Sequence, residues 1–469
     1  MTETQFIENR TFDEIKVGDT ATLSRTLRAE DIQLFAVMSG DVNPAHVDPD
    51  YAKSSMFREV IAHGMWGGAL ISTVLGTQFP GPGTIYVDQS LHFSRPVGIG
   101  DTVTIRVTAA RKFEHNRHII MDCLCTNQDG LEVIRGQAEV LAPREKVKRP
   151  RIMLPEVQLH DRNARYKQLM ALTEGLPKLA CAVAHPCDEA SLKGALGARD
   201  AGLIRPLLVG PDAKIRATAR TFGLDLNDTQ IVDVPHSHAA AAISVELVRR
   251  GEAQALMKGS LHTDELMAEV VSRATGLRTA RRISHVFLMD VPAYPHPLFI
   301  TDAAVNIEPS LEEKVDIVQN AIDLCHALGM DRPKVAILSA VETVTPKLRS
   351  TLDAAALCKM ADRGQITGGE LDGPLAFDNA VSLMAARTKG IKSLVAGNAE
   401  ILVVPDLESG NMLAKQVEYF ADGQAAGIVL GAKVPIVLTS RADSMHSRIA
   451  SCAVAVLVAN HQARNKAPA

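Results

Sequence analysis

The periodicity of apolar residues changes along the chain, and this change limits the folds that a single core could explain. Between residues 84 and 142, runs such as DTVTIRVTAARKFE and HIIMDCLCTN alternate apolar and polar residues, with turn sequences such as NQDG between them. From Leu169 onward, continuous apolar runs such as KLACAVAH and KVAILSA alternate with helix-forming segments. Alternation favours antiparallel strands with one solvated face, whereas continuous runs with helical crossovers favour a parallel sheet covered on both faces. The chain is therefore predicted to contain two domains of different class.

The first domain, residues 1–143, is predicted to be an α+β fold in which a sheet wraps around a helix. Four strands are expected within residues 84–97, 101–114, 118–127 and 132–142, and two helices over residues 29–39 and 64–76. Residues 144–165 begin with REKVKRPRIMLPEV, a charged, proline-containing stretch without periodicity. This composition is typical of a solvated linker.

The second domain, residues 166–469, is predicted to be a two-lobed α/β fold with mostly parallel sheets and a cleft between the lobes. Its expected strands, each followed by helix-forming sequence, fall within residues 178–185, 205–210, 253–259, 334–340, 400–406 and 434–440. At 469 residues the chain exceeds the size of one typical core, in agreement with this division.

The composition excludes several classes of function. A formal net charge of −4 argues against a protein that coats nucleic acid, and no apolar run approaches the roughly 20 residues of a membrane span. The N-terminus MTETQFIENR lacks the basic start and apolar core of a signal peptide. The seven cysteines include no CxxC pair, which argues against a disulfide framework or a zinc site, and Cys123 and Cys125 would share the packed face of one strand. We expect a cytoplasmic protein that binds neither nucleic acid nor a membrane.

The stretch SGDVNPAH, residues 39–46, places an acid, an amide, a proline and a histidine within eight residues. Gly40 and Pro44 would end the preceding helix, so that Asp41 and His46 lie on a loop that can face a pocket. A carboxylate beside an imidazole can take a proton from water and supply one to carbon, and the amides at the start of the helix at Gly64 can bind a developing oxyanion. The alternative is structural: Asp41 and Asn43 would cap a turn, and His46 would pack against it.

The longer string TLRAEDIQLFAVMSGDVNPAHVDPDYAKSSMFREVIAHGMW resembles the MaoC-like, (R)-specific enoyl-CoA hydratase family, which has a hot-dog fold. The resemblance covers nearly all of residues 10–142. It implies that Asp41 and His46 are the acid–base pair, that Asn43 supports them, and that Gly64 presents an oxyanion-binding amide. It also implies reversible hydration of a 2-enoyl-CoA to an (R)-3-hydroxyacyl-CoA without a metal or organic cofactor, in a dimer or larger even-numbered homo-oligomer. His63 either contacts the substrate or holds the loop before the helix.

Clusters of polar residues follow three predicted strands of the second domain, in the segments MKGSLHTDEL, PDLESGNML and VPIVLTSRADS. Ligands of open α/β sheets bind beyond the carboxyl ends of strands, where helix N-termini present free amides. We expect helices to follow Lys258-Gly259 and to begin near Gly410-Asn411 and Ser440-Arg441, and Arg441 to supply a guanidinium for an oxyanion. No GxxxxGK[ST] or GxGxxG motif supports a nucleotide or dinucleotide site.

Taken together, segments from HVFLMDVPAYPHPLFITDAAVNIEPSLEEKVDIVQNAI through GPLAFDNAV and ILVVPDLESGNML to PIVLTSRADS resemble the phosphate acetyltransferase and phosphate butyryltransferase family over residues 170–460. The resemblance implies an architecture similar to that of isocitrate dehydrogenase, and reversible acyl transfer between coenzyme A and inorganic phosphate. Coenzyme A thioesters and phosphate would be substrates, with no resident cofactor.

The same resemblance assigns residues in the second domain. Ser440 and Arg441 match the family's Ser-Arg pair at the reacting centre, and Asp302, Asn306 and Asn411 would line the cleft. The acetyltransferase branch has an aspartate at the position of Ser447, a departure here. Asp443 is our substitute candidate for the base, with structural capping as the alternative.

Three points stay open from the sequence. The family's other phosphate-binding arginine has no clear match, and Arg281 and Arg282 are guesses. The transferase half could be a catalytically silent acyl-CoA-binding or oligomerisation module, as the Ser447 departure suggests. It could also be a nicotinamide- and metal-dependent decarboxylating dehydrogenase, which has a similar two-lobed architecture and should show a cluster of aspartates.

Overall fold

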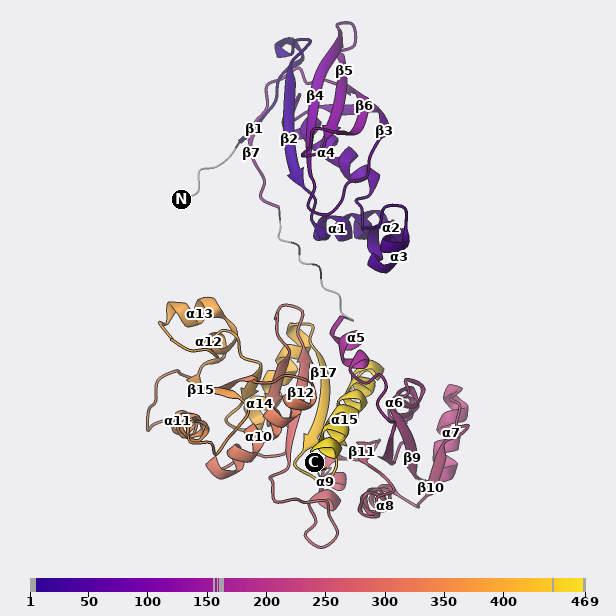
Figure 1. Ribbon diagram of the computed structural model, residues 1–469, viewed down its shortest axis with the longest axis vertical. Helices are drawn as coiled ribbons and strands as arrows, with labels where there is room; N and C mark the ends of the chain where they lie inside the picture. Colours follow the sequence, from indigo (N-terminus) through magenta and orange to yellow (C-terminus); the bar gives the residue numbers. More distant parts are fainter. Residues whose placement is uncertain (1–5, 155–156, 158, 160–163, 441–442, 467–469) are drawn as a thin grey trace. The chain divides into compact units, whose positions relative to one another are not determined.

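The chain forms two compact units, Met1–His160 and Asp161–Ala469, in a computed structural model (Figure 1). The structure describes residues 6–154, 157, 159, 164–440 and 443–466. Each unit has its own hydrophobic core, and each is considered by itself below.

The first unit contains an antiparallel sheet around a long helix. Its strands are β1 (Phe6–Glu8), β2 (Thr20–Thr26), β3 (Ile85–Phe93), β4 (Thr102–Phe113), β5 (His118–Thr126), β6 (Glu132–Leu141) and β7 (Lys148–Pro150). Its helices are η1 (Phe12–Glu14), α1 (Ala29–Ser39), α2 (Pro44–Val47), α3 (Pro49–Ser54) and α4 (Gly64–Thr77). The main sheet has the order β2-β4-β5-β6-β3, so β2 and β3 are its edges.

The apolar face of this sheet closes on α4, which buries Trp66, Leu70 and Ile71. Burial alternates along β4 and β5, as predicted for antiparallel strands with one packed face, and Cys123 and Cys125 both lie on that face. Strand β2 was not predicted, because TATLSRT is polar and mostly exposed at a sheet edge. The other edge, β3, exposes apolar side chains, among them Ile85, Val87 and Phe93.

Part of the predicted linker belongs to the first unit. Strand β7 pairs antiparallel with β1, and Phe6 lies opposite Pro150. The buried Asn9 amide fixes this ribbon by donating to the Pro82 and Glu145 carbonyls (3.0 and 2.8 Å). The Lys146 and Lys148 side chains lie within 3.7 Å of Glu8 carboxylate oxygens, so two of the basic residues of the segment form ion pairs within the first unit.

The second unit is built on one continuous sheet of eleven strands, in the order β10-β9-β8-β11-β18-β17-β12-β13-β16-β14-β15. Its strands are β8 (Leu179–Ala184), β9 (Ile204–Gly210), β10 (Gln230–Asp233), β11 (Ala255–Lys258), β12 (Ser284–Asp290), β13 (Leu298–Thr301), β14 (Lys334–Leu338), β15 (Glu370–Leu375), β16 (Ile401–Val403), β17 (Gln424–Leu430) and β18 (Ile436–Val437). The two predicted lobes therefore share a single sheet.

Helices connect the strands and cover both faces of this sheet (Figure 1). They are α5 (Ala164–Ala171), α6 (Glu189–Asp200), α7 (Asp212–Phe222), α8 (Ser237–Arg249), α9 (Thr263–Val271), α10 (Leu311–Ala327), α11 (Arg349–Asp362), α12 (Phe377–Val381), α13 (Leu383–Thr388), α14 (Leu407–Phe420) and α15 (Met445–Lys466). Most strands pair in parallel, but β12 pairs antiparallel with both β17 and β13, and β17 also pairs antiparallel with β18. Among the described residues, no helix is long and apolar enough to cross a membrane.

Candidate active sites

The first site begins where α1 ends at Gly40, whose positive φ of 75° reverses the chain direction. The Asp41 carboxylate accepts the Asn43 N–H (3.2 Å), and the Asn43 side chain accepts the Ala45 N–H (3.1 Å) and so caps α2. Asn43 thus has a local structural contact that positions His46, which lies in α2. The capping described by the structural alternative is present, and it leaves one Asp41 oxygen available to a ligand.

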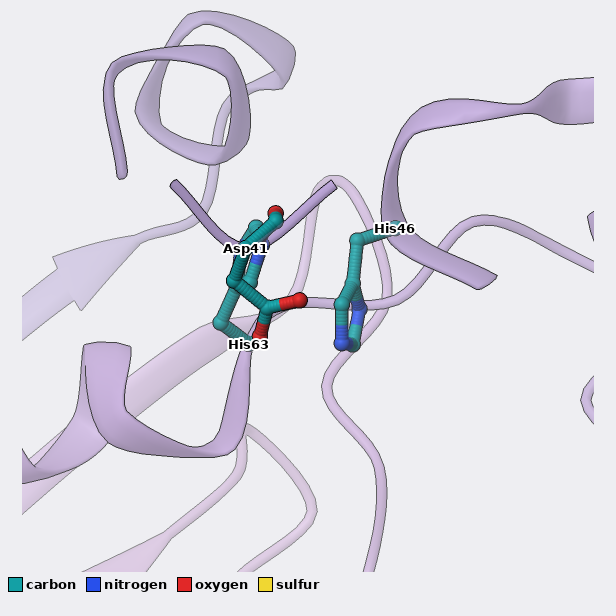
Figure 2. Close-up of side chains that lie close together, drawn as sticks. All are labelled: Asp41, His46 and His63. Carbon is teal, nitrogen blue, oxygen red and sulfur yellow. Dashed lines mark hydrogen bonds between the residues drawn. The ribbon is translucent and has the colours of Figure 1, made fainter. Parts of the chain in front are cut away.

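The half-buried His46 ring is held in one orientation. Its Nδ1 lies 2.9 Å from the Ile61 carbonyl oxygen. Because a carbonyl only accepts, Nδ1 carries the proton in the neutral ring and Nε2 keeps a lone pair. Figure 2 shows the Asp41 carboxyl group directed toward this ring. Asp41 and His46 are therefore brought together, as a carboxylate and an oriented imidazole.

His63 lies behind this pair and is buried. Its Nε2 is 3.0 Å from the Asp41 backbone oxygen, and its ring centroid is 4.1 Å from that of His46. These contacts support a role in holding the loop. Ligand atoms of Asp41, His46 and His63 lie within 4.8 Å of one another, the one such grouping among the described residues that could hold a metal ion.

A cavity of about 310 Å³ opens beside His46. Its lining is mainly apolar with a few polar side chains, and it consists of His46, Phe57, Ile61, Ala62, His63, Gly64, Trp66, Gly67, Phe93, Ser94, Arg95, Pro96, Val97, Val103, Val133 and Ile134. Gly64 is the first residue of α4, and no side chain caps that end of the helix. The amide end of α4 therefore faces the cavity next to the imidazole, as the oxyanion role requires.

The second site is a cavity of about 200 Å³ in the second unit. Three predicted residues, Asn411, Ser440 and Asp443, line it. Its other lining residues are Thr263, His285, Phe287, Met289, Ala304, Ala414, Lys415, Glu418, Ala425, Leu438 and Thr439. Arg441, assigned above to phosphate, lies outside the described residues.

Asp443 is half-buried and accepts the Ser440 backbone N–H (2.7 Å). Burial raises the pKa of its carboxyl, and the Ser440 amide with the nearby cations Arg448, Lys415 and Lys258 opposes that rise. Burial and the neighbouring Asp443 also raise the pKa of Glu418. Two carboxyls with raised pKa values in one cavity indicate a place where protons can be exchanged.

Two buried cations lie near this loop, and the sequence analysis assigned neither of them a role in the site. Arg448 is 3% exposed and donates to the Thr439 hydroxyl (2.8 Å) and the Ser440 carbonyl (2.7 Å). Lys258 is 5% exposed, with its Nζ 3.5 Å from the Thr439 carbonyl oxygen. Arg448 lies in the first turn of α15, eight residues after Ser440, and only the folded structure shows that it and Lys258 support the Thr439–Ser440 backbone.

Asp302 and Asn306 do not line this cavity. Asp302 is buried and accepts the backbone N–H groups of Ala304, Val305 and Asn306 (3.0–3.1 Å), and burial raises its pKa. Asn306 donates to Asp302 and to the Ile283 carbonyl. In this structure both side chains satisfy the turn that carries Ala304, and neither is among the residues that line the Ser440 cavity.

Arg281 and Arg282 also have structural partners. Arg281 pairs with Asp323, and Arg282 pairs with Glu313 (2.9 Å) and donates to Asn306 (2.6 Å). Neither arginine is among the residues that line the Ser440 cavity. The structure therefore does not support either guess for a phosphate-binding arginine.

Ser447 points to a different cavity, of about 330 Å³, lined mainly by apolar residues such as Leu169, Leu288 and Phe299. Its hydroxyl lies 3.1 Å from that of Ser444.

Two predicted helix starts were also wrong: α14 begins at Leu407 after its cap Asp406, and α15 begins at Met445. Asn411 is therefore in the second turn of α14, where it donates to the Ala303 carbonyl (3.2 Å) and still reaches the cavity.

The fold defines a class of two-domain protein. An antiparallel sheet wrapped around a helix is followed in the chain by an α/β domain with a large, mostly parallel sheet. A "MaoC like domain" model matches residues 14–123, and a "Phosphate acetyl/butaryl transferase" model matches residues 236–456. A phosphate acetyltransferase of Rhizobium meliloti is 65% identical over 296 residues, which cover 63% of this chain and 94% of that protein. The chain therefore belongs to the phosphate acetyl/butyryl transferase family, and it carries a MaoC-like hot-dog domain before the transferase domain.

Solved structures resemble each part. A branched-chain phosphotransacylase of Enterococcus faecalis is 30% identical and covers 60% of this chain and 100% of its own, with a TM-score of 0.53. An R-hydratase of Pseudomonas aeruginosa is 41% identical and covers 33% of this chain and 99% of its own, with a TM-score of 0.32. The predicted fusion and both fold classes are confirmed. The chain is an enzyme of the transferase class with a hydratase-type domain, and the dehydrogenase alternative is removed.

Proposed function

We propose that the chain is a bifunctional acyl-CoA enzyme. Its first unit reversibly hydrates a 2-enoyl-CoA to an (R)-3-hydroxyacyl-CoA, and its second unit reversibly transfers an acyl group between coenzyme A and phosphate. The observation that carries the first activity is the Asp41 carboxylate facing an oriented His46 ring beside the open amide end of α4. The observation that carries the second is the convergence of Ser440, Asp443 and Asn411 on one cavity.

In the proposed hydration, water lies between the Asp41 carboxylate and His46 Nε2. One of these groups removes a proton as the water oxygen bonds to C3, and the other returns a proton to C2. The charge that develops on the thioester oxygen is stabilised by the Gly64 amide at the start of α4. Proton transfer and oxyanion binding come from protein groups alone, so we propose no resident cofactor.

In the proposed transfer, a phosphate oxygen attacks the thioester carbonyl carbon, a C–O bond forms, and the C–S bond breaks. The products are an acyl phosphate and coenzyme A, whose thiolate takes a proton. In the reverse direction Asp443 removes that thiol proton, and its raised pKa makes it a stronger base than an exposed carboxylate. Ser440 hydrogen-bonds at the reacting carbonyl, and the cations Lys258, Arg448 and Lys415 provide a positive field for phosphate.

We also propose a homo-oligomer with an even number of subunits, located in the cytoplasm. The edge strand β3 leaves unpaired backbone groups beside exposed Ile85, Val87 and Phe93, a surface that a second copy can cover by antiparallel pairing. All seven cysteines are free thiols, as expected in a reducing compartment that supplies coenzyme A esters. Sedimentation of the intact chain measures the subunit number, and a monomer would contradict this part.

The test of the two activities is a panel of coenzyme A thioesters of increasing acyl length. Addition of water is followed by loss of the conjugated double bond, and transfer by phosphate-dependent release of free thiol. Chiral chromatography of the hydration product determines whether the (R) isomer is formed. Failure of every 2-enoyl-CoA to react would overturn the first assignment, and a pure (S) product would overturn its stereochemistry.

A second candidate for the transferase unit is an acyl-CoA-binding module without turnover. The position of Ser447 favours it, because the serine faces another cavity and supplies no base to Ser440. Phosphate-dependent thiol release with any member of the panel would exclude this candidate. Tight thioester binding without release would favour it and would remove Asp443 as the base.

A further inference from the structure

A buried histidine in the transferase cavity has no use in the proposed transfer. His285 lies on β12, is 0% exposed, and lines the same cavity as Ser440 and Asp443. Neither ring nitrogen has a hydrogen-bond partner with acceptable geometry. Buried polar atoms in proteins are nearly always paired, so an unpaired imidazole in a cavity wall indicates a position that a ligand completes.

The position of His285 on β12 determines which face of the sheet its side chain points from. Side chains alternate along β12: His285 and Phe287 line this cavity, Leu288 and Asp290 line the apolar cavity that Ser447 also lines, and Met289 borders both. The neighbouring strand leaves room for the ring at Gly427, where an added Cβ would lie 3.0 Å from His285 Nε2. The Phe287 ring packs edge-on against the imidazole, with the ring centroids 4.3 Å apart.

The imidazole is neutral in the folded protein. Burial lowers the pKa of His285 to about 3, and the nearby Leu438 backbone opposes this lowering. A neutral imidazole donates one hydrogen bond and accepts another, and it brings no charge into the cavity. It therefore suits an uncharged group with both properties, such as a hydroxyl.

The apolar lining residues of this cavity are Phe287, Met289, Ala304, Ala414, Ala425 and Leu438, and they share it with polar residues that include Thr263, Lys415 and Glu418. The apolar residues can accept a short hydrocarbon chain, and the His285 imidazole beside them can select a chain with a polar substituent. The first unit, in its proposed activity, produces an acyl chain of this kind, with a hydroxyl at C3.

We propose that the acyl cavity of the transferase unit is selective for 3-hydroxyacyl groups and that His285 binds the 3-hydroxyl. This inference rests on the proposed function of both units. The transferase step is then attack of a phosphate oxygen on the 3-hydroxyacyl thioester carbonyl, with formation of a C–O bond, cleavage of the C–S bond, and release of coenzyme A and a 3-hydroxyacyl phosphate. The hydratase unit would thus supply the substrate that the transferase unit consumes.

The experiment compares (R)-3-hydroxybutyryl-CoA with butyryl-CoA, which differ by the hydroxyl alone. The full-length chain carries Asp41→Asn, so that dehydration by the first unit does not consume the hydroxylated substrate, and kcat/KM is measured from phosphate-dependent thiol release. We expect a preference of about 10- to 100-fold for the hydroxylated substrate, because the imidazole stays unpaired with butyryl-CoA. His285→Phe should reduce this preference to about twofold or less and raise kcat/KM for butyryl-CoA.

Met289→Leu is the matched control, because it changes a buried residue of the same wall without removing a hydrogen-bonding group. It should preserve the ratio of the two kcat/KM values. His285→Gln keeps a donor and an acceptor, so it should keep part of the preference if His285→Phe does not fold. The wild-type ratio itself needs no variant at position 285.

The outcomes separate this inference from the proposed function. Equal kcat/KM values for the two substrates would overturn the inference and leave acyl transfer intact. A preference that His285→Phe does not change would overturn the role of His285. Absence of thiol release with either substrate would overturn the transferase assignment and, with it, this inference.

Discussion

The two candidate sites use similar acids in opposite surroundings. Asp41 is exposed on a loop, and its partner His46 is oriented by one backbone carbonyl. Asp443 is half-buried with a raised pKa, above a loop held by the buried Arg448. In the first site the reactive pair comes from one stretch of six residues, whereas the second is assembled from β12, α14 and the loop before α15. We therefore expect the second site to be more sensitive than the first to changes in the packing around it.

The largest expected difference between the two sites follows from removing the acid–base pair of the first site, Asp41 and His46. Asp41→Asn or His46→Gln should each lower the hydration rate by about 10³-fold, because general acid–base catalysis typically contributes 10²–10⁴-fold. Acyl transfer should be unchanged, since the units have separate cores. The two rates are measured on the same preparation with an enoyl-CoA and with an acyl-CoA plus phosphate.

Asp50→Asn is the matched control for this test. Asp50 is a nearby exposed acid whose side chain is 94% accessible. It should leave hydration within about twofold of wild type, as expected for a surface change. Hydration above about a tenth of the wild-type rate in both Asp41→Asn and His46→Gln would contradict the assignment of the pair.

The corresponding change in the second site is Asp443→Asn. We expect acyl transfer toward the thioester to fall by about 10- to 100-fold, because the thiol loses its base. The exposed Asp331→Asn serves as a control on the same unit. Hydration should be unaffected in both variants, and wild-type transfer in Asp443→Asn would leave Asp443 with the capping role alone.

The raised pKa of Asp443 also predicts a pH dependence. As a base, the carboxylate must be ionised, so transfer toward the thioester should fall as pH decreases through a pKa above the ordinary aspartate value of 3.8. A pH profile of kcat/KM measures this limb, which Asp443→Asn should remove. A limb at or below the ordinary aspartate value would conflict with the buried environment of this carboxyl.

A smaller effect concerns the stability of the second unit. The pKa of His285 is about 3 in the folded state and 6.5 when unperturbed, so between these values the unfolded chain binds a proton that the folded chain does not. Its contribution to stability is therefore complete above pH 6.5 and is lost as pH falls toward 3. The slope is about 1.4 kcal/mol per pH unit.

Urea unfolding at several pH values, compared between wild type and His285→Phe, measures this slope. Fluorescence of the single tryptophan, Trp66, reports the first unit and circular dichroism reports both, so the two transitions can be separated. The variant should lose the His285 component of the pH dependence while the tryptophan transition stays the same. Identical slopes would mean that the imidazole is not kept neutral by burial.

The smallest expected effect is at Ser447. Ser447→Ala and Ser447→Asp should each leave acyl transfer within about twofold of wild type, because this side chain faces Ser444 and the apolar cavity and does not line the Ser440 cavity. Steady-state transfer kinetics check this prediction. A large gain in Ser447→Asp would show that the aspartate position of the acetyltransferase branch is still usable.

The parts of the molecule that the sequence predicted are those with local signals. Alternation along residues 101–127 predicted β4 and β5, and the spacing of Asp41 and His46 predicted their proximity, because a four-residue helix capped by Asn43 connects them. The Ser440 loop was also found, from a contiguous motif. In each of these cases a few consecutive residues determine the local geometry.

The parts that were missed depend on contacts between distant segments. Asp302 resembles a cleft residue in sequence, and only the turn around Ala304 shows that its carboxylate is used by backbone amides. The function of His285 could not be inferred from β12 alone, because its burial depends on β17 and Leu438. The pairing of β1 with β7 joins segments about 140 residues apart, and neither of these three-residue strands has a periodic pattern.

The pairing of β1 with β7 has a mechanical consequence. Phe6 lies opposite Pro150, so a force that pulls on the chain after Pro150 would act first on the pair at that end of the two strands. The backbone hydrogen bonds between β1 and β7 would then break one after another, at low force. The five-stranded sheet and the Asp41–His46 loop would stay folded while these two short strands separate.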